Sequence, residues 1–376
     1  MRYSSYYLYR KYEQRDGQDV LPVVPTTYSF DGEGTMPKVL HIADDPSCSE
    51  IPVLYRWVDM DISTDYWCDE CSGSVTTYKA KGNKYNIDIS KRTYSIPCNN
   101  SSILEYNEFY NLNIEEVQTL IVGNCVSGIS SDLLMLEITS GISIPSSVTS
   151  IGSGAFSNNQ AMTFCIIENG LRTIGGQAFS GCTQLVNLEL PDSIEEIGAN
   201  AFSYCTNLRQ IHIPTGLTEI SEGCFYCCIG ILDATIPNGV TSIGASAFSY
   251  CVSLVEVTVP STVTSIGDYA FSDCTEFAGI SIPNNVTSIG QYAFAGCKSF
   301  TGCTIGSGIT SIGNRAFNNC SNLSGVTINA TTPPTLGNNA FYNTNDCPIY
   351  VPSASVSAYQ SASGWSDYSS RIQAKP

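Results

Sequence analysis

Long hydrophobic runs, histidine and positive charge are all scarce in this 376-residue sequence. No apolar run approaches the ~20 residues that a membrane-spanning helix needs, so we expect no membrane insertion. Only two histidines, His41 and His212, are present, which leaves little material for catalytic triads or imidazole-rich metal sites. Basic residues number 17 against 34 acidic ones, and the resulting charge of −17 argues against nucleic acid and other phosphate-rich partners.

Catalytic motifs are missing as well. The sequence contains no G-x-S-x-G, no HExxH, no P-loop and no dinucleotide-binding fingerprint. We therefore predict a non-enzymatic protein with no cofactor. The first residues, MRYSSYYLYRKYEQ, lack the apolar core of a secretory signal, so no signal peptide is expected in the sequence as given.

What the sequence has instead is a repeat. Phenylalanine recurs every 23 residues through eight units, and Phe341 follows after 24. Each phenylalanine closes a shared segment, such as VTSIGASAF (240–248) or VTSIGQYAF (286–294). A unit of this size cannot bury its own apolar face, so neighbouring units must stack along one axis. The eight phenylalanines are Phe156, Phe179, Phe202, Phe225, Phe248, Phe271, Phe294 and Phe317.

The pattern within a unit predicts its local structure. In LVNLELP (185–191) the leucines alternate with polar residues, as in a strand with one buried face, and Pro191 ends it. A second extended pair and a turn glycine follow in IEEIG (194–198), and ANAFSYC (199–205) suits a single turn. Stacked units would then form a continuous parallel sheet around a phenylalanine spine. Ser221 replaces the turn glycine in its unit, and Cys224 replaces the alanine before Phe225.

A cysteine stands three residues after the phenylalanine in seven consecutive units. Stacked thiols suggest metal or redox chemistry, but cysteine is also a small, readily buried apolar residue. No histidine or lysine recurs at a fixed offset to lower the thiol pKa, so we favour a core ladder. We expect Cys224 and Cys227, which are out of register, to lie on the convex turn. The ladder consists of Cys182, Cys205, Cys228, Cys251, Cys274, Cys297 and Cys320.

The array resembles the BspA-like leucine-rich-repeat family over about residues 120–374. The matching frame is I-P-x-x-V-T-S-I-G-x-x-A-F-x-x-C-x-x-L, most complete at 236–254 and 282–300. The resemblance implies a leucine-rich-repeat solenoid with a parallel β-sheet on its concave face and short turns or helical turns opposite. It also implies a non-catalytic binding role at the cell surface.

Charge and pattern divide the chain into four parts. Residues 1–100 hold 11 basic and 14 acidic side chains, whereas residues 101–376 hold 6 and 20. We predict a small β-rich domain or tandem β modules over 1–100 and an amino-terminal cap with a degenerate repeat over 101–145. The spacing of apolar residues predicts a helix over 102–120 within that cap. Repeats follow over 146–345, and a carboxy-terminal cap over 346–376.

Four amino-terminal cysteines are weak metal candidates. Cys68 and Cys71 form a CxxC, with Cys48 and Cys98 on either side. Two such pairs would indicate zinc strongly, but only one is present, so local disulfides or free thiols are the favoured alternatives. An enzyme or metal site in this domain is the least favoured hypothesis for the protein.

The outward positions of the repeat strands are the candidate binding surface, because solenoids usually bind on their extended sheet face. They are most varied in the early and middle units. We predict an extracellular or cell-surface adhesion and recognition protein that binds a protein or glycan on a host or bacterial surface. The alternative is a phage virion component that recognises a bacterial surface. The candidate residues are Phe164, Ile166, Asn187, Glu189, Gln210, His212, Asp233, Thr235, Glu256 and Thr258.

Overall fold

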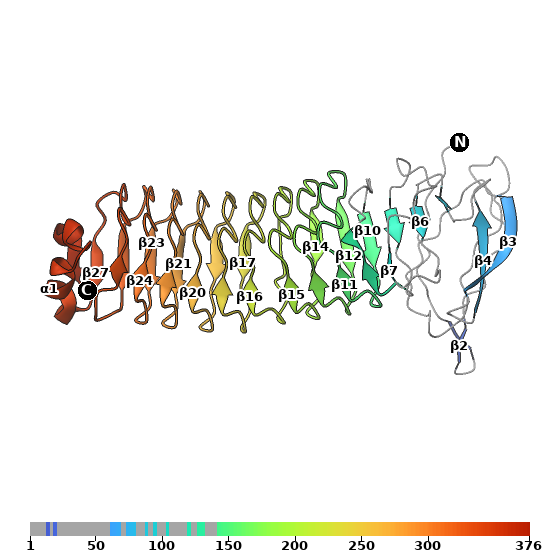
Figure 1. Cartoon of the computed structure of the whole chain (residues 1–376), viewed down its shortest axis with the longest axis horizontal. Coiled ribbons are helices and arrows are strands. Elements are labelled where there is room, and N and C mark those ends of the chain that lie inside the picture. The colour runs from blue at the N-terminus through green and yellow to red at the C-terminus, as the bar shows by residue number, and fades with distance from the viewer. Residues whose placement is uncertain are drawn as a thin grey trace.

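The computed structural model describes residues 126–131 and 141–376, apart from the side chain of Asn187, and the backbone of eight short strands nearer the amino terminus. A typical repeat unit contributes a longer strand, a two-residue strand and a turn segment. Successive units stack side by side along one axis, from β7 to the helix α1 at the far end (Figure 1). The fold is a parallel-strand solenoid, which confirms the architecture that the 23-residue period predicts.

The longer strands form one side of the array, called here the long-strand face. Equivalent residues of neighbouring units pair in parallel, for example Ile142 with Cys165 and Asp233 with Glu256, whereas β5 at the amino-terminal end pairs antiparallel with β6. Alternate residues point into the core and are buried. Its strands are β5 (Ile87–Asp88), β6 (Thr93–Ser95), β8 (Thr119–Ile121), β10 (Gly141–Ile144), β12 (Phe164–Ile167), β14 (Asn187–Glu189), β17 (Asp233–Thr235), β19 (Glu256–Thr258), β21 (Gly279–Ile282), β23 (Gly302–Ile305), β25 (Gly325–Ile328), β27 (Ile349–Val351) and β28 (Ile372–Ala374).

Two-residue strands form a second parallel side, the short-strand face. Each one buries its apolar second residue, such as Ile243 or Ile266, and presents a polar first residue. Its strands are β7 (Ile103–Leu104), β9 (Gly128–Ile129), β11 (Ser150–Ile151), β13 (Thr173–Ile174), β15 (Glu196–Ile197), β16 (Glu219–Ile220), β18 (Ser242–Ile243), β20 (Ser265–Ile266), β22 (Ser288–Ile289), β24 (Ser311–Ile312) and β26 (Thr335–Leu336).

The repeat phenylalanines form a continuous stack through the core, from Phe156 to Phe341. Neighbouring ring centroids lie 5.2–5.7 Å apart, and all nine side chains are buried. Phe277 and Phe300 pack against the same stack. Burial of each ring removes a large apolar area from water, so this stack is a main source of the array's stability.

The seven ladder cysteines lie buried beside the phenylalanines as free thiols. Each Sγ donates a hydrogen bond of 3.0–3.2 Å to the carbonyl of the phenylalanine one unit earlier, as Cys205 does to Phe179. The thiol therefore does more than fill space, because it also satisfies a buried carbonyl. Cys224 and Cys227 both lie in a turn segment, as expected, but the side chain of Cys224 is buried in the place of the repeat alanine.

We expect the ladder thiols to resist alkylation in the folded protein. Burial raises the pKa of all seven, to about 12 for Cys182 and Cys320, so almost no thiolate is present at about pH 8. Iodoacetamide labelling with peptide mass spectrometry should leave them unmodified until denaturant is added. Half-buried Cys227 is the internal reference and should react first. Ladder thiols that react as fast as Cys227 in the native protein would contradict the buried ladder.

The turn segments form the third side of the array, called here the turn side. Each turn holds two residues in the left-handed region. One stands two positions before the phenylalanine and the other two positions after it, as Ser246 and Tyr250 do around Phe248. Backbone amides of one turn donate to carbonyls of the next, for example Phe248 to Ala270 at 2.8 Å. The turns are therefore not helical, and they form a ladder of their own.

The sheets are not continuous, contrary to the sequence prediction. On the short-strand face β15 does not pair with β16, and on the long-strand face no strand forms between β14 and β17, all within the described part of the chain. These two interruptions fall at one boundary, between the units of Phe202 and Phe225, called here the junction. A third lies further along the long-strand face, where β19 does not pair with β21. The turn side stays connected across it, since Phe202 N donates to Cys224 O at 2.9 Å.

Ser221 explains the break at the junction. In the other units the turn glycine donates its amide to an isoleucine carbonyl of the preceding unit at 2.7–2.8 Å. A Cβ added to any of these glycines would lie only 2.3–2.7 Å from backbone atoms of that unit, closer than real Cβ atoms approach. Ser221 has such a Cβ, so the two units must separate. Its hydroxyl, not its amide, donates to Ile197 O.

The carboxy-terminal cap comprises the 3₁₀ helix η5 (Ser353–Ser355), α1 (Val356–Ser361), the 3₁₀ helix η6 (Ser366–Arg371) and β28. Trp365 packs against Phe341, and Tyr359 packs against Trp365. Their polar atoms are satisfied, since Trp365 Nε1 donates to Pro334 O at 2.7 Å and the Tyr359 hydroxyl to Ala330 O at 2.9 Å. No helix in the described residues has the length and apolarity to cross a bilayer.

Towards the amino terminus the parallel pairing reaches further than the change in composition suggests. β6 pairs in parallel with β8, so a strand before residue 100 already belongs to the long-strand face. β7 is a strand at the start of the segment 102–120, where the apolar spacing predicts a helix. Residues 105–118 of that segment lie outside the described residues. Earlier, β1 (Glu13–Arg15) pairs with β2 (Gln18–Val20), and β3 (Asp61–Cys68) with β4 (Gly73–Lys79), both antiparallel. The four-part domain division stays a prediction.

Candidate recognition surface

The outward positions of the long strands lie side by side on one face. The pairing registers align Ile166 with Glu189, and Thr235 with Thr258. Glu189, Gln210, His212, Asp233, Thr235, Glu256 and Thr258 are all exposed. Asn187 pairs with Phe164 through the backbone, but its side chain lies outside the described part.

An apolar pair begins this surface on β12. Ile166 is 53% exposed, an unusual position for a large aliphatic side chain, and Phe164 is half-buried. The ring of Phe164 lies across Gly141 of the neighbouring strand, where an added Cβ would come within 2.7 Å of it. Gly141 therefore makes room for the Phe164 ring, which packs against the sheet.

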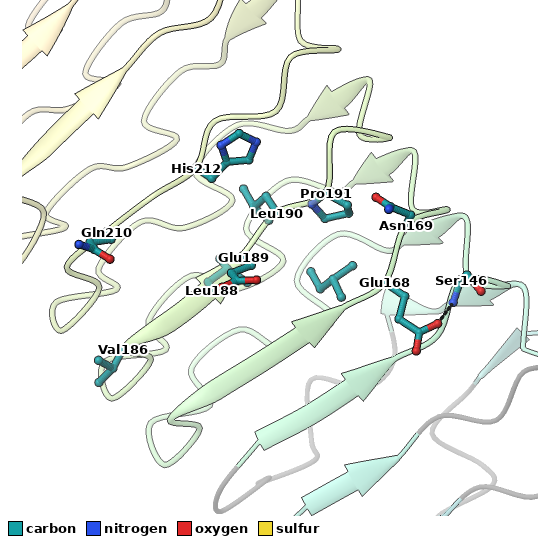
Figure 2. Close-up of a pocket in the computed structure, with 11 residues that line it drawn as sticks. Ser146, Glu168, Asn169, Val186, Leu188, Glu189, Leu190, Pro191, Gln210 and His212 are labelled. Atoms are coloured by element: carbon teal, nitrogen blue, oxygen red, sulfur yellow. Dashed lines mark hydrogen bonds between the residues drawn. The ribbon is translucent and has the colours of Figure 1, made fainter. Parts of the chain in front are cut away.

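A hollow of about 810 Å³ opens on this face at the junction. Figure 2 shows Glu168, Glu189 and His212 around it, contributed by three neighbouring units. Val186, Leu188 and Leu190 supply apolar lining. Because the unit with Gln210 and His212 forms no ladder with β14, the hollow coincides with the break in the sheet. The remaining lining residues are Ser146, Ile167, Asn169, Pro191 and Gln210.

Side chains replace backbone pairing across the junction beside this hollow. Asp192 Oδ1 accepts hydrogen bonds from Thr215 N at 2.9 Å and from His212 Nε2 at 3.0 Å. The Thr215 amide, followed by His212, lowers the pKa of the Asp192 carboxyl, so Asp192 is ionised at neutral pH. In the preceding unit Glu168 Oε2 accepts from Ser146 N at 3.0 Å (Figure 2). These bonds fix the charged groups at the rim of the hollow.

Beyond the junction, Asp233 and Glu256 stand directly opposite each other on paired strands. Like charges in this arrangement destabilise a sheet. Both are exposed, and the ion pairs in the described residues, Arg172 with Glu195 and His212 with Asp192, involve neither of them. The middle of the long-strand face thus carries uncompensated negative charge.

A second hollow of about 790 Å³ lies further along the same face. It takes in two predicted residues, Glu256 and Thr258. Its other outward strand residues are small, namely Gly279, Ser281 and Thr304, and Val257, Val259, Ile280 and Ile282 supply apolar lining. It offers fewer side chains that could distinguish one partner from another than the hollow at the junction does.

Sequence reasoning missed several residues that line the first hollow, notably Glu168 and Val186. A signal for Glu168 was available: it stands where the repeat frame has proline, as at Pro145 and Pro191. Gly306 is the corresponding departure at the second hollow. Proline offers only a backbone carbonyl for hydrogen bonding. At these two positions the strand end also offers a backbone N–H, and Glu168 adds a carboxylate.

The metal candidates receive no structural support from the described residues. Cys68 is the last residue of β3, Cys48, Cys71 and Cys98 lie outside the described residues, and no side chain of the four is described. Within the described part of the chain, no group of three or more His, Cys, Asp or Glu side chains could hold a metal ion. The zinc hypothesis therefore stays a prediction for the amino-terminal region.

Two comparisons with known proteins match the repeat array. A family model described as "BspA type Leucine rich repeat region" matches residues 127–255 and 241–362. A leucine-rich cell-surface protein of Faecalibacterium prausnitzii has 22% identity and a TM-score of 0.42, covering 77% of this chain and 76% of its own. No curated protein sequence matches the chain.

Further solved structures show the same kind of similarity. A leucine-rich-repeat protein of Bacteroides ovatus has 17% identity and a TM-score of 0.35, with 78% of this chain and 98% of that one covered. The pneumococcal vaccine antigen PcpA has 17% identity and a TM-score of 0.39, with 69% and 78% covered.

Proposed function

Because this chain belongs to the BspA-type leucine-rich-repeat family, we propose that it is a non-catalytic recognition protein that uses its long-strand face to bind a protein or glycan. The observation that supports this most directly is the hollow at the junction. It combines apolar lining with Glu168, Glu189 and His212, which hydrogen bonds and strand pairing hold in place. A concave, partly apolar site with a few fixed polar groups is the usual form of a binding pocket.

The partner in this proposal lies on a host or bacterial surface, and the protein acts outside the cell or at its surface as an adhesion and recognition molecule. Repeat proteins of this family are typically non-catalytic surface proteins, which supports the location and the binding role. The opposed carboxylates of Asp233 and Glu256 extend the binding surface along the array from the hollow. A partner with basic or hydrogen-bond-donating groups would relieve their mutual repulsion.

Charge reversal at the junction should weaken recognition of the partner. The full chain is first applied to immobilised glycans and extracellular-matrix proteins, and any ligand that binds is titrated by surface plasmon resonance. We expect Glu189→Lys to raise the Kd about ten-fold, because an attraction becomes a repulsion at the rim of the hollow. Asp233→Lys and Glu256→Lys should act in the same direction but more weakly.

Glu219→Lys is the matched control, since Glu219 is an exposed glutamate on the short-strand face and gives the same change in net charge. It should leave the Kd within two-fold of the wild type. If Glu189→Lys binds as well as Glu219→Lys does, the long-strand face is not the recognition surface.

A further inference from the structure

Three tyrosines on the turn side, exposed Tyr204 and Tyr250 with half-buried Tyr226 between them, form a chain of rings called here the tyrosine ribbon. Tyr204 and Tyr226 lie 5.3 Å apart between ring centroids, and Tyr226 and Tyr250 lie 5.8 Å apart, both edge to face. Tyr204 is 49% exposed and Tyr250 44%. The ribbon spans three consecutive units and lies on a different side of the solenoid from the long-strand face.

Two of these tyrosines occupy positions that disfavour them. Tyr204 has a φ of 61° and Tyr250 a φ of 60°, in the left-handed region that bulky side chains rarely adopt. Both stand at the second left-handed position of their turns. Most other units place there a residue that tolerates this conformation, namely Asn158, Gly181, Asp273, Gly296, Asn319 and Asn343.

The fold thus does not require the ribbon. Asparagine or glycine at these positions would remove backbone strain, and the exposed rings bury little area in return. Tyr226 is also an exception, because five other units have serine directly after the phenylalanine. Residues kept against local preference, and arranged next to one another, point to a role in binding.

The same chain shows what its turn-side tyrosines can bind. Arg315 places its guanidinium 5.6 Å from the ring centroid of Tyr292, and its Nη1 donates to the Tyr292 hydroxyl at 2.7 Å. Tyr292 in turn stacks on Tyr269, with the centroids 4.8 Å apart. A guanidinium therefore fits over a tyrosine of this surface, with its charge on the ring face and a hydrogen bond at the ring's edge.

The ribbon has the same aromatic chemistry but no such cation. In the described part of the chain, no lysine or arginine lies over Tyr204, Tyr226 or Tyr250. The charged group beside the ribbon is instead the carboxylate of Asp273, which lies next to Tyr250 and raises the pKa of its phenol. Residues 101–376 carry 6 basic and 20 acidic side chains, so long-range attraction favours a cationic partner.

We propose that the tyrosine ribbon is a second binding surface, which takes an arginine-rich segment of a partner protein. Guanidinium groups of the segment lie over the exposed rings, and Asp273 pairs with one of them. The ribbon has no basic side chain of its own that would select an anionic sugar or phosphate. The proposal is independent of the function of the long-strand face.

The chain supplies its own replacements for the test. Tyr204→Asn and Tyr250→Asn introduce the residue that other units carry at the same left-handed position, and Tyr226→Ser introduces the residue common after the phenylalanine. The triple variant should therefore fold at least as well as the wild type, and its net charge is unchanged. The matched control is Tyr342→Ser, which removes the 61% exposed tyrosine that follows Phe341.

Binding of a fluorescent oligoarginine peptide to the full-length protein is measured by anisotropy at ~0.15 M salt, where screening weakens non-specific attraction. We expect the triple variant to raise the Kd about ten-fold or more, since each exposed cation–π contact accounts for about two- to five-fold. Tyr342→Ser should bind as the wild type does, and Asp273→Asn should bind a few-fold more weakly.

Two results would overturn the proposal. One is equal peptide affinity of the triple variant and the wild type, which would mean that the rings do not hold the cation. The other is ribbon-dependent binding of a neutral oligosaccharide with no ribbon-dependent binding of oligoarginine, which would assign the surface to sugars. Glu189→Lys leaves the ribbon intact, and the ribbon variants leave the long-strand face intact. The two proposals can therefore fail independently of each other.

Discussion

Replacement of Phe271 by alanine should lower the free energy of unfolding by about 3–5 kcal/mol. The ring is completely buried and stacks on Phe248 and Phe294 at 5.4 Å on each side, with Phe277 at 5.5 Å. Its removal leaves a cavity in the middle of the spine, which the two flanking units cannot fill because the backbone ladders of the short-strand face and the turn side fix their spacing.

Urea denaturation followed by circular dichroism measures this loss, and hydrogen exchange shows where it acts. In a solenoid each unit contacts only its neighbours, so faster exchange should be confined to the units of Phe248, Phe271 and Phe294 and should spare the carboxy-terminal cap. Phe271→Leu retains most of the apolar volume and should cost less than half as much. A loss below about 1 kcal/mol for the alanine variant would mean that the spine is not a main source of stability.

The sequence period determines the core almost completely. Phenylalanine and cysteine positions repeat at 23 residues, and the structure stacks them as nine rings and seven thiols. Alternation in the strand segments also identifies outward residues such as Glu189 and Glu256, which are exposed. These features depend only on which residues are buried away from water. In a repeat the same apolar pattern occurs in every unit, so the buried positions are easy to identify.

Features that depend on contact between units are harder to predict. Cys224 is buried because the alanine it replaces faces the core, a fact that spacing from the phenylalanine alone does not reveal. The left-handed turns, which hold Tyr204 and Tyr250, contain no consistent glycine, so the composition of the turn does not indicate them. Single departures from the frame, such as Glu168 and Ser221, proved to be informative, because each coincides with the hollow or with the break in the sheet.

Ser221→Gly should close the break in the short-strand face. Without the Cβ, the residue 221 amide can approach Ile197 O as the other turn glycines approach their partners, and β15 can pair with β16. One backbone hydrogen bond and restored packing should raise the stability of the junction by about 1 kcal/mol. Amides of residues 218–221 should exchange more slowly with solvent. The hollow beside His212 should narrow, and affinity for a ligand bound there should fall.

The reciprocal change, Gly267→Ser, should open a second break in the short-strand face, between β18 and β20, where the strands now pair. A Cβ at this position would lie 2.6 Å from Ala245 N, a backbone atom that cannot rotate away, so the units must separate as they do at Ser221. We expect a loss of about 1–3 kcal/mol and faster exchange of the amides that join β18 to β20. Gly302→Ser is the matched control, because the nearest atom to a Cβ there is 3.8 Å away. If both serine variants are equally stable, close approach of the turn glycine does not hold the units together, and Ser221 is not the cause of the junction.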